Sequence, residues 1–332
     1  MHLLFVGLVD VKLSDNITAI ENETFRYCSN LKTINIPSKL ISIGEYAFEN
    51  CQSLTQISLP NTLTNIGEGA FQFCKGLTTV TIPGSVETMG ERVLGDCENL
   101  ILVELLHGVK NIGKRMFYNC DKLEEVKIPN SVIKIDYGAF CDCGTLKNVI
   151  IPDSVTSIEG DAFASCKSLT SIIIPNSVMS MGDNVFDNCI SLTSVTLSNN
   201  ITTISDRTFS NCGFTTFVIP DNITRIGVSA FHGCYNLKNI EIPNSVTKID
   251  EWAFWSCKSL TTIYIPDSVN YIEGYIDSRS PFCNCLSSLK IYCEANEKKS
   301  NWMTFWNYNG ENSELSVTYG ITREVYESTY KQ

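Results

Sequence analysis

The sequence predicts an α/β solenoid, a stack of about 12 similar coils in which each coil adds one strand to a parallel sheet. Two observations carry this prediction. A cysteine recurs every 23 residues from Cys28 to Cys212, and the series continues at Cys234 and Cys257. Nine of the ten prolines occupy a single position of the same period, between Pro37 and Pro266. A fixed period of this length is typical of repeat architectures in which each unit buries its neighbour.

One unit, residues 31–53, shows the expected order of elements. Ile34 and Ile36 alternate with polar residues, which is the pattern of a half-buried strand. Pro37 follows and ends the strand, because proline has no N–H to donate to the ladder. After a polar turn, Gly44 opens a segment in which apolar residues recur three and four positions apart, ending at Cys51. This spacing predicts a helix of about two turns.

Stacking would align equivalent residues of successive coils into columns. The most regular column is aromatic and consists of Phe25, Phe48, Phe71, Phe117, Phe140, Phe163, Phe186, Phe209, Phe231 and Phe254. Because a helical segment is bulkier than a strand, we expect the stack to curve with its sheet on the concave side.

The repeated unit L-x-x-I-x-I-P-x-S-V-x-x-I-G-x-x-A-F-x-x-C resembles the BspA-type leucine-rich repeat family over about residues 8–293. The resemblance implies a right-handed leucine-rich repeat superhelix. It also implies the role of similar bacterial and protist surface proteins, which act in adhesion and in binding host or matrix proteins. Fold alone does not dictate function, so this role is an expectation.

Two units depart from the pattern. Between about residues 89 and 108, Leu94 replaces the phenylalanine and Leu106 replaces the proline, so we expect a distorted coil there. A one-residue deletion at 212–214 shortens a later unit, and Phe217 takes a strand position that other units give to isoleucine. Both changes are explained more simply by local repacking of the core than by a binding site.

We expect residues 1–293 to form the solenoid, with a partial coil at 1–30, and residues 294–332 to form a C-terminal cap. The apolar N-terminal segment lacks a basic region and a cleavage site, so it does not read as a signal peptide. The chain is then either complete at Met1 or a piece of a longer protein. Trp302 and Trp306 fit a cap over the last coil, with a carbohydrate platform as the alternative.

Eleven cysteines form the column and are expected to be reduced and buried, since free cysteine behaves as a small apolar residue. Cys141, Cys283, Cys285 and Cys293 lie off the column. The last three could form a disulfide or contribute to a metal site. However, no C-x-x-C motif is present, and a packing role for these cysteines is the simpler interpretation.

Composition excludes several functional classes. The net charge of -11 opposes binding to nucleic acid or to anionic lipid. The sequence contains no stretch of about 20 apolar residues, which is the length that a membrane-spanning helix needs. Only His2, His107 and His232 are present, and no nucleophile, zinc or nucleotide motif occurs. We therefore expect no enzyme activity, no catalytic or metal-binding residues and no cofactor.

The outward positions of the predicted sheet are the remaining candidate site. Most carry Thr, Ser or charged residues, but one column holds Ile150, Ile173, Val218 and Tyr264. An apolar patch on a polar face can mark a binding site, although β-branched residues also simply favour strands. A weaker candidate lies on the convex side, where variable positions hold aromatic residues: Phe73, Tyr118, Trp252 and Trp255.

The sequence thus predicts a non-catalytic module that binds a protein partner through the concave sheet. The family resemblance implies a host or matrix protein as partner and a cell-surface or secreted location. The alternative is an intracellular interaction scaffold, since the chain shows no signal peptide and its cysteines read as reduced. The partner's identity and the oligomeric state stay open.

Overall fold

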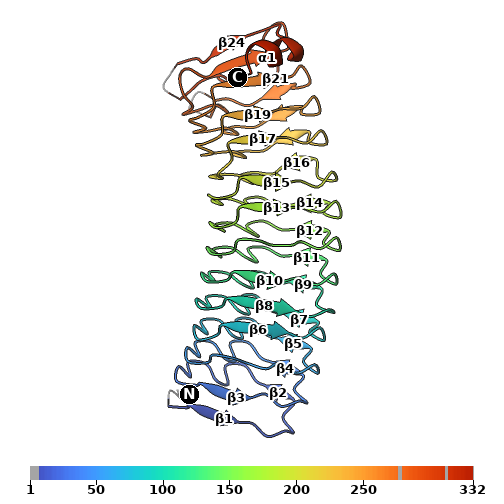
Figure 1. Ribbon diagram of the computed structural model, residues 1–332, viewed down its shortest axis with the longest axis vertical. Coiled ribbons are helices and arrows are strands. Elements are labelled where there is room, and N and C mark those ends of the chain that lie inside the picture. The colour runs from blue at the N-terminus through green and yellow to red at the C-terminus, as the bar shows by residue number, and fades with distance from the viewer. Residues whose placement is uncertain (1–6, 276–278, 311–312, 332) are drawn as a thin grey trace. The chain divides into compact units, whose positions relative to one another are not determined.

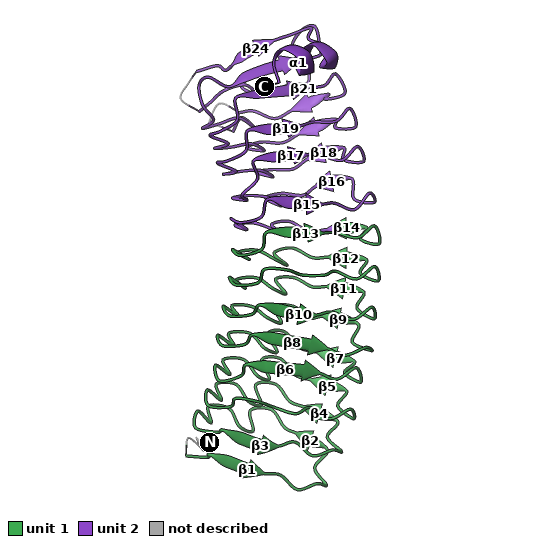
Figure 2. Ribbon diagram, viewed as in Figure 1, with its two compact units in different colours: residues 1–180 green, residues 181–332 purple. Residues whose placement is uncertain are grey.

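The computed structural model describes residues 7–275, 279–310 and 313–331 of the chain. It is a parallel β-solenoid of about 13 turns of about 23 residues, with almost no helix. The chain divides into two compact units, residues 1–180 and residues 181–332 (Figure 2). The first six residues of the expected partial coil lie outside the described part of the chain.

Each coil contributes up to two short strands, which fall into two columns of the stack (Figure 1). In the first unit the first strands are β1 (Asp10–Lys12), β3 (Thr33–Asn35), β6 (Thr79–Ile82), β8 (Leu102–Leu105), β10 (Glu125–Lys127) and β13 (Ser171–Ile173). The second strands are β2 (Ala19–Ile20), β4 (Ser42–Ile43), β5 (Asn65–Ile66), β7 (Thr88–Met89), β9 (Asn111–Ile112), β11 (Lys134–Ile135) and β12 (Ser157–Ile158). Strand β14 (Ser180–Met181) lies at the boundary between the units.

The second unit repeats this order and adds a helix. Its first strands are β15 (Ser194–Thr196), β17 (Thr216–Val218), β19 (Asn239–Glu241), β21 (Thr262–Ile265), β23 (Lys290–Cys293) and β24 (Ser316–Thr318). The second strands are β16 (Thr203–Ile204), β18 (Arg225–Ile226), β20 (Lys248–Ile249) and β22 (Tyr271–Ile272), and helix α1 spans Arg323–Thr329.

Paired strands are parallel and their register follows the repeat. Thr79 of β6 pairs with Leu102 of β8, and Glu125 of β10 pairs with that same residue. Along β6 the side chains of Val80 and Ile82 are buried, whereas the intervening threonines are exposed. The predicted half-buried strand is therefore confirmed.

The predicted two-turn helix at residues 44–51 is wrong. Tyr46 and Asn50 have φ values of 53° and 64°, in the left-handed region that interrupts an α-helix. The N–H groups of Tyr46 and Phe48 donate instead to Glu68 and Ala70 in the next coil, at 2.7 and 2.8 Å. The segment is a run of tight turns hydrogen-bonded to its neighbour. The predicted leucine-rich repeat solenoid with its parallel sheet is confirmed, and it contains almost no helix.

The phenylalanine column fills the interior of each unit. The ring of Phe140 is fully buried and stacks on Phe117 and Phe163, with centroids 5.3 and 5.1 Å apart. Offset stacking at such distances adds to the area that the rings bury. The aromatic column predicted from the repeat is therefore confirmed within the units.

The cysteine column lies beside the rings and is hydrogen-bonded to the coil before it. The thiol of Cys143, for example, donates to the carbonyl oxygen of Phe117 at 3.1 Å. All fifteen cysteines are free in the structure. The expectation that Cys285 lies off the column is wrong, because its thiol donates to the carbonyl of Phe254 at 3.2 Å, and Phe282 stacks on the Phe254 ring.

The two irregular units keep their cores. In the first, Leu94 is fully buried in the phenylalanine position, and the pairing of second strands stops between β7 and β9. At the deletion, Phe214 and Phe217 pack edge to face at 4.9 Å and both rings contact the ring of Phe209. Additional aromatic volume thus replaces the residue that the shorter coil lacks.

The C-terminal segment covers the last phenylalanine of the column. Trp302 and Trp306 are both buried, and the Trp306 ring meets Phe282 edge to face at 6.3 Å. The indole N–H of Trp302 donates to the carbonyl of Val269 at 3.1 Å. A carbohydrate platform needs exposed rings, so that alternative is wrong. The domain boundary at 293/294 stays a prediction, since β24 continues the parallel sheet beyond it.

We expect Phe140→Ala to lower the free energy of unfolding by about 3–5 kcal/mol, because it removes a ring stacked on both sides and leaves a cavity. The measurement is urea unfolding followed by circular dichroism. Ile150→Ala, at a side chain that is 84% exposed, is the control and should change stability by less than about 0.5 kcal/mol. Equal effects of the two changes would contradict the stacked core.

The buried thiols should make the protein sensitive to alkali. Burial raises the pKa of Cys97 to about 12, whereas an unfolded thiol titrates near ~8.5. The stabilising contribution of the neutral thiol is therefore complete below ~8.5 and is lost as the pH rises toward 12. The stability difference between wild type and Cys97→Ala should shrink by about 1.4 kcal/mol per pH unit above about pH 9 in urea titrations. A pH-independent difference would show that this thiol is not held neutral.

Candidate functional site

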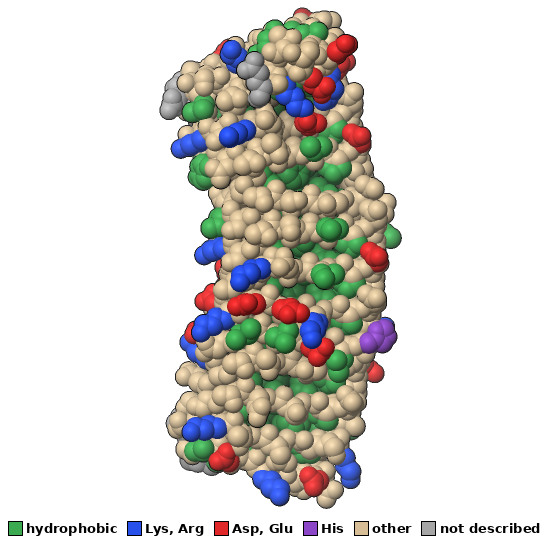
Figure 3. Space-filling view, in the orientation of Figure 1, with side chains coloured by type: hydrophobic (Ala, Val, Ile, Leu, Met, Phe, Trp, Pro, Cys, Tyr) green, Lys and Arg blue, Asp and Glu red, His purple; other side chains and the backbone are tan. Residues whose placement is uncertain are grey.

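The candidate site is the outward side of the first strands, which we call the sheet face. In the first unit this face is mostly polar, and separate hydrophobic side chains stand among polar and charged ones in the space-filling view (Figure 3). Ile150 and Ile173 project from it with 84% and 67% of their surface exposed. Both side chains therefore point outward, as the sequence predicted.

Ile150 and Ile173 occupy the same position in consecutive coils, so their side chains belong to one column of the sheet face. The coil before them places Lys127 in that column, and its ammonium group lies 3.5 Å from the Glu104 carboxylate. The apolar pair is therefore bordered by charge on one side. This arrangement of a small apolar centre with a polar rim is common in protein interfaces.

The ladder of first strands is interrupted at two coils of the first unit. Residues 55–59 and 147–151 form no strand, and no described backbone hydrogen bond joins 147–151 to residues 124–128 of the preceding coil. A cavity of about 500 Å³ opens there, lined by Glu124, Glu125, Val126, Lys127, Ile128, Lys147, Asn148 and Ile150. We call it the 147–151 slot. Sequence reasoning missed it, because the residues 146–152 keep the strand pattern of the other units.

In the second unit the sheet face is partly covered. Val218 is 66% exposed on β17, as expected for an outward residue. Tyr264 is only 3% exposed, which corrects the expectation that it forms part of an open patch. Helix α1 covers it, with the Tyr326 ring 5.1 Å away and the Arg323 guanidinium 4.8 Å above the Tyr264 ring.

Helix α1 is attached to the sheet face at several points. Arg323 donates to the carbonyl of Ile242 at 2.7 Å, and the hydroxyls of Tyr326 and Thr262 lie 3.0 Å apart. Lys331 forms an ion pair with Glu241. The helix leaves a cavity of about 520 Å³ beside Val218, lined by Val218, Ile219, Asp221, Glu241, Pro243, Asn244, Ser245, Arg323 and Glu327.

The four aromatic residues of the weaker candidate are all half-buried, which leaves their rings less exposed than a binding surface requires. The Arg92 guanidinium lies 5.2 Å above the Tyr118 ring, and Trp255 stacks on His232 at 4.5 Å. Burial, together with the charge of Arg207, lowers the pKa of His232. The rings of Tyr118 and Trp255 thus pack against neighbouring coils, which favours a structural role for these two residues.

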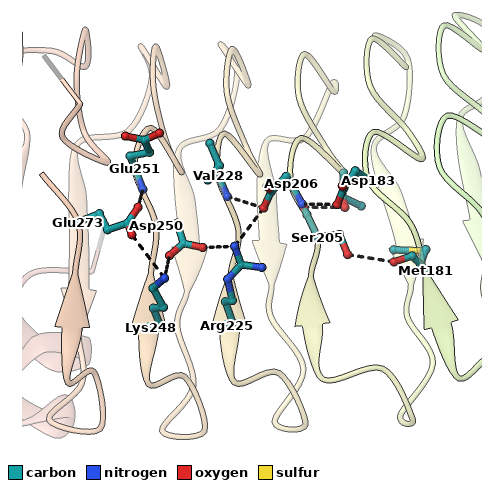
Figure 4. A network of polar contacts seen from close by, with 11 residues as sticks. Met181, Asp183, Ser205, Asp206, Arg225, Val228, Lys248, Asp250, Glu251 and Glu273 are labelled. Carbon is teal, nitrogen blue, oxygen red and sulfur yellow. Dashed lines mark hydrogen bonds and ion pairs between the residues drawn. The ribbon is translucent and has the colours of Figure 1, made fainter. Parts of the chain in front are cut away.

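The most extensive charged network lies in the second unit along the second strands (Figure 4). The carboxylate of Asp250 is 1% exposed and forms ion pairs with Arg225 and with Lys248, the latter at 2.7 Å. Lys248 also reaches Glu273 at 3.4 Å. Burial alone would lower the pKa of Lys248, but the hydrogen bond and charge of Asp250 outweigh it and raise that pKa. The network joins adjacent coils, and the charge of Asp250 is balanced by Arg225 and Lys248.

Within residues 7–275, 279–310 and 313–331, no group of three His, Cys, Asp or Glu side chains is placed to hold a metal ion. None of the helices in that part of the chain has the length and apolar character needed to cross a membrane.

Comparison with known proteins decides the family. The chain matches the family described as BspA type leucine rich repeat region (6 copies) at residues 6–124, 110–238 and 202–323. The chain belongs to this family. The leucine-rich repeat resemblance inferred from the repeated unit is therefore confirmed. Leucine-rich repeat proteins of this kind are generally non-enzymatic interaction modules.

Solved structures of similar proteins agree with this assignment. A leucine-rich repeat protein from Bacteroides ovatus is 28% identical, with 80% of each chain covered and a TM-score of 0.59. A leucine rich cell surface protein from Faecalibacterium prausnitzii is 33% identical, with 76% of this chain and 78% of that chain covered and a TM-score of 0.52. The pneumococcal vaccine antigen PcpA, at 18% identity and a TM-score of 0.58 over 94% of this chain and 79% of that chain, shares the fold. No curated protein matches the sequence.

The Asp250 network predicts an asymmetric response to mutation. Replacing both cations (Arg225→Met with Lys248→Met) leaves a buried carboxylate without a counter-charge and should cost about 3–5 kcal/mol in chemical unfolding. Asp250→Asn keeps the shape and leaves two cations that reach solvent, so its cost should be nearer about 1 kcal/mol. Adding Asp250→Asn to the double variant should restore most of the lost stability, and failure of this rescue would argue against the buried charge as the cause.

Proposed function

We propose that this protein is a non-catalytic binding module that docks a host or matrix protein on its sheet face, at the cell surface or as a secreted protein. The observation that carries the proposal is the pair Ile150 and Ile173, two adjacent and strongly exposed apolar side chains on a face that is otherwise polar. Isolated exposed apolar residues are ordinary, but two in register on a rigid sheet give a partner a defined apolar contact.

The remaining features of the first unit support the same function. The pair sits beside charged residues, including the Lys127 and Glu104 ion pair, which can orient a partner and disfavour wrong ones. A stable protein interface buries about 800 Å² on each partner, an area that several coils of the sheet face can supply. Shape-matched burial needs no covalent step, so binding itself would be the activity.

A second candidate function, an intracellular scaffold, is favoured by one observation. All fifteen cysteines are free, and proteins that fold in oxidising compartments tend to form disulfides. The two functions differ in location. An antibody against the folded protein should label intact cells if the protein is displayed, whereas labelling that requires permeabilised cells would favour the scaffold.

Replacing the apolar pair should abolish binding without unfolding the protein. We expect Ile150→Lys with Ile173→Lys to weaken binding to extracellular matrix deposited by cultured cells by about tenfold or more, because central apolar contacts dominate interface energies. The measurement is solid-phase binding, with circular dichroism as the check on folding.

Met179→Lys is the matched control, because Met179 is 69% exposed but lies after the turn and outside the first strands. It should bind matrix like the wild type. Equal binding by the control and the double variant, or no binding of matrix by the wild type, would contradict the proposed site.

A further inference from the structure

Helix α1 covers a pair of tyrosines on the sheet face of the second unit (Figure 1). Tyr264 of β21 and Tyr292 of β23 pair in register and occupy the outward position that holds the exposed Val218 two coils before Tyr264. The two tyrosines are nevertheless only 3% and 5% exposed, because the Tyr326 ring lies 5.1 Å from the first ring and 5.4 Å from the second. We call residues 321–331, which include α1, the cover.

The cover is not what closes the core. The end of the phenylalanine column is closed by Trp306, whose ring meets Phe282 and whose carbonyl accepts a hydrogen bond from the Ser280 hydroxyl at 2.7 Å. The cover belongs to a separate apolar cluster, which consists of Tyr264, Tyr292 and Tyr326 with Ile321 and Tyr330 packed against it. Lifting the cover would therefore expose the tyrosine pair and leave the aromatic core closed.

The contacts that hold the cover are few for a docked segment. Helix α1 has seven residues, too few to be stable as an isolated helix, so its order depends on docking. Among these residues only Tyr326 is buried, and its neighbour Val325 is 43% exposed. The ion pair between Lys331 and Glu241 is partly open to solvent, where dissolved salt screens it.

The surface beneath the cover is incompletely packed and incompletely satisfied. The cavity of about 520 Å³ lies between Arg323 and Glu327 of α1 and the strands β17 and β19. The hydroxyl of Tyr264 is buried with no hydrogen-bond partner in the described part of the chain. Empty space loses packing contacts, and a buried hydroxyl without a partner is unfavourable. A ligand that fills the space or reaches the hydroxyl could thus compete with the cover.

The contacts of α1 show which chemistry this surface accepts. The Arg323 guanidinium lies 4.8 Å above the Tyr264 ring. Three residues later Tyr326 packs against both sheet tyrosines, and four residues after that the Tyr330 ring stacks on Tyr292 at 4.3 Å. The surface therefore fits a helical segment in which a basic residue is followed by aromatic residues three and seven positions later.

The charge of the surface agrees with that pattern. The sheet residues that line the cavity include the carboxylates of Asp221 and Glu241 and no cation, and the outward Lys290 of β23 is not part of the lining. The two cations beside these carboxylates, Arg323 and Lys331, both belong to the cover. When the cover leaves, the carboxylates lose these counter-charges, so a segment that replaces it needs basic residues of its own.

We propose that the cover is a displaceable intramolecular ligand, and that Tyr264 and Tyr292 form a docking site for a helical segment of the partner protein with the same basic and aromatic pattern. This inference rests on the proposed function for the partner, and it adds a second contact site that is closed in the free protein. A segment that binds only the open site shifts the protein toward it, and the closed fraction lowers its apparent affinity.

The test uses the full chain with one residue of the cover changed. Tyr326→Asp places a charge at the buried position of α1 and leaves the sheet tyrosines unaltered, so it should open the site without unfolding the solenoid. Val325→Asp changes the neighbouring exposed residue of the same helix and is the matched control, which should stay closed. Circular dichroism and urea unfolding check that both variants keep the fold.

The probe is a capped, fluorescent peptide with the sequence of residues 319–331. In fluorescence anisotropy it should bind the Tyr326→Asp protein saturably, and bind the wild type and Val325→Asp at least about tenfold more weakly, because their own cover occupies the site. A peptide that itself carries Tyr326→Asp should not bind. Adding Tyr264→Thr to the open variant should weaken binding about tenfold. Thr196 occupies the same outward position in an earlier coil, so the fold tolerates threonine there.

Binding to deposited extracellular matrix is the second readout. The Tyr326→Asp protein should bind matrix about tenfold more tightly than the wild type, because no cover has to be displaced. Val325→Asp should bind matrix like the wild type.

The outcomes separate this proposal from the proposed function. The cover proposal is overturned if the peptide binds the wild type and the open variant equally, if it fails to bind the open variant, or if the wild type binds matrix and opening leaves that binding unchanged. Absence of matrix binding by both proteins contradicts the proposed function, and the peptide result then decides the docking site. Matrix binding by the wild type without discrimination by the peptide leaves the proposed function standing and removes the cover.

Discussion

Each coil of this protein is completed by the next one through backbone hydrogen bonds, and the rest of the structure depends on that constraint. The strands pair across coils, and so do the turns that the sequence pattern would assign to helices, as the N–H of Phe48 donating to Ala70 illustrates. A helix satisfies its own N–H groups, whereas these turns satisfy only half of theirs locally. The repeat therefore cannot be stable as a single unit, and its length follows from the need for neighbours.

The cysteine column follows from the same constraint. The carbonyl of Phe117 accepts the N–H of Cys120 within its own coil and the thiol of Cys143 from the next coil. A thiol at this position is small enough to pack beside the ring, apolar enough to be buried, and still able to donate a weak hydrogen bond. A serine would bury a stronger polar group, and an alanine would leave the second lone pair of the carbonyl without a donor. The periodic cysteine is thus a packing device that also links coils.

The sequence predicted the repeat length, the register, the aromatic column and the family, because all of these depend on periodicity. The secondary-structure prediction failed where the same apolar spacing is compatible with a helix and with a run of turns. The apolar spacing of residues 44–51 suits a helix, but Asn50, Asn119 and Asn188 precede the cysteine in their coils and adopt positive φ. Asparagine tolerates that conformation better than most residues, so this position carried the signal for turns. The burial of Tyr264 depends on α1, about 60 residues later, and the opening at 147–151 occurs within an unremarkable repeat, so no local pattern could reveal either.

The division between closed and open surfaces connects the architecture to binding. On the second strands of the second unit, the buried Asp250 carboxylate is balanced by Lys248 of its own coil and by Arg225 of the preceding one. On the sheet face of the first unit, Ile150 is exposed and the Glu125 carboxylate faces an open slot. Because the core, the turns and the second strands already fix the position of each coil, the outward residues of the first strands are free to vary without loss of the fold. A solenoid of this kind can therefore present a rigid surface whose specificity is set by a few outward side chains.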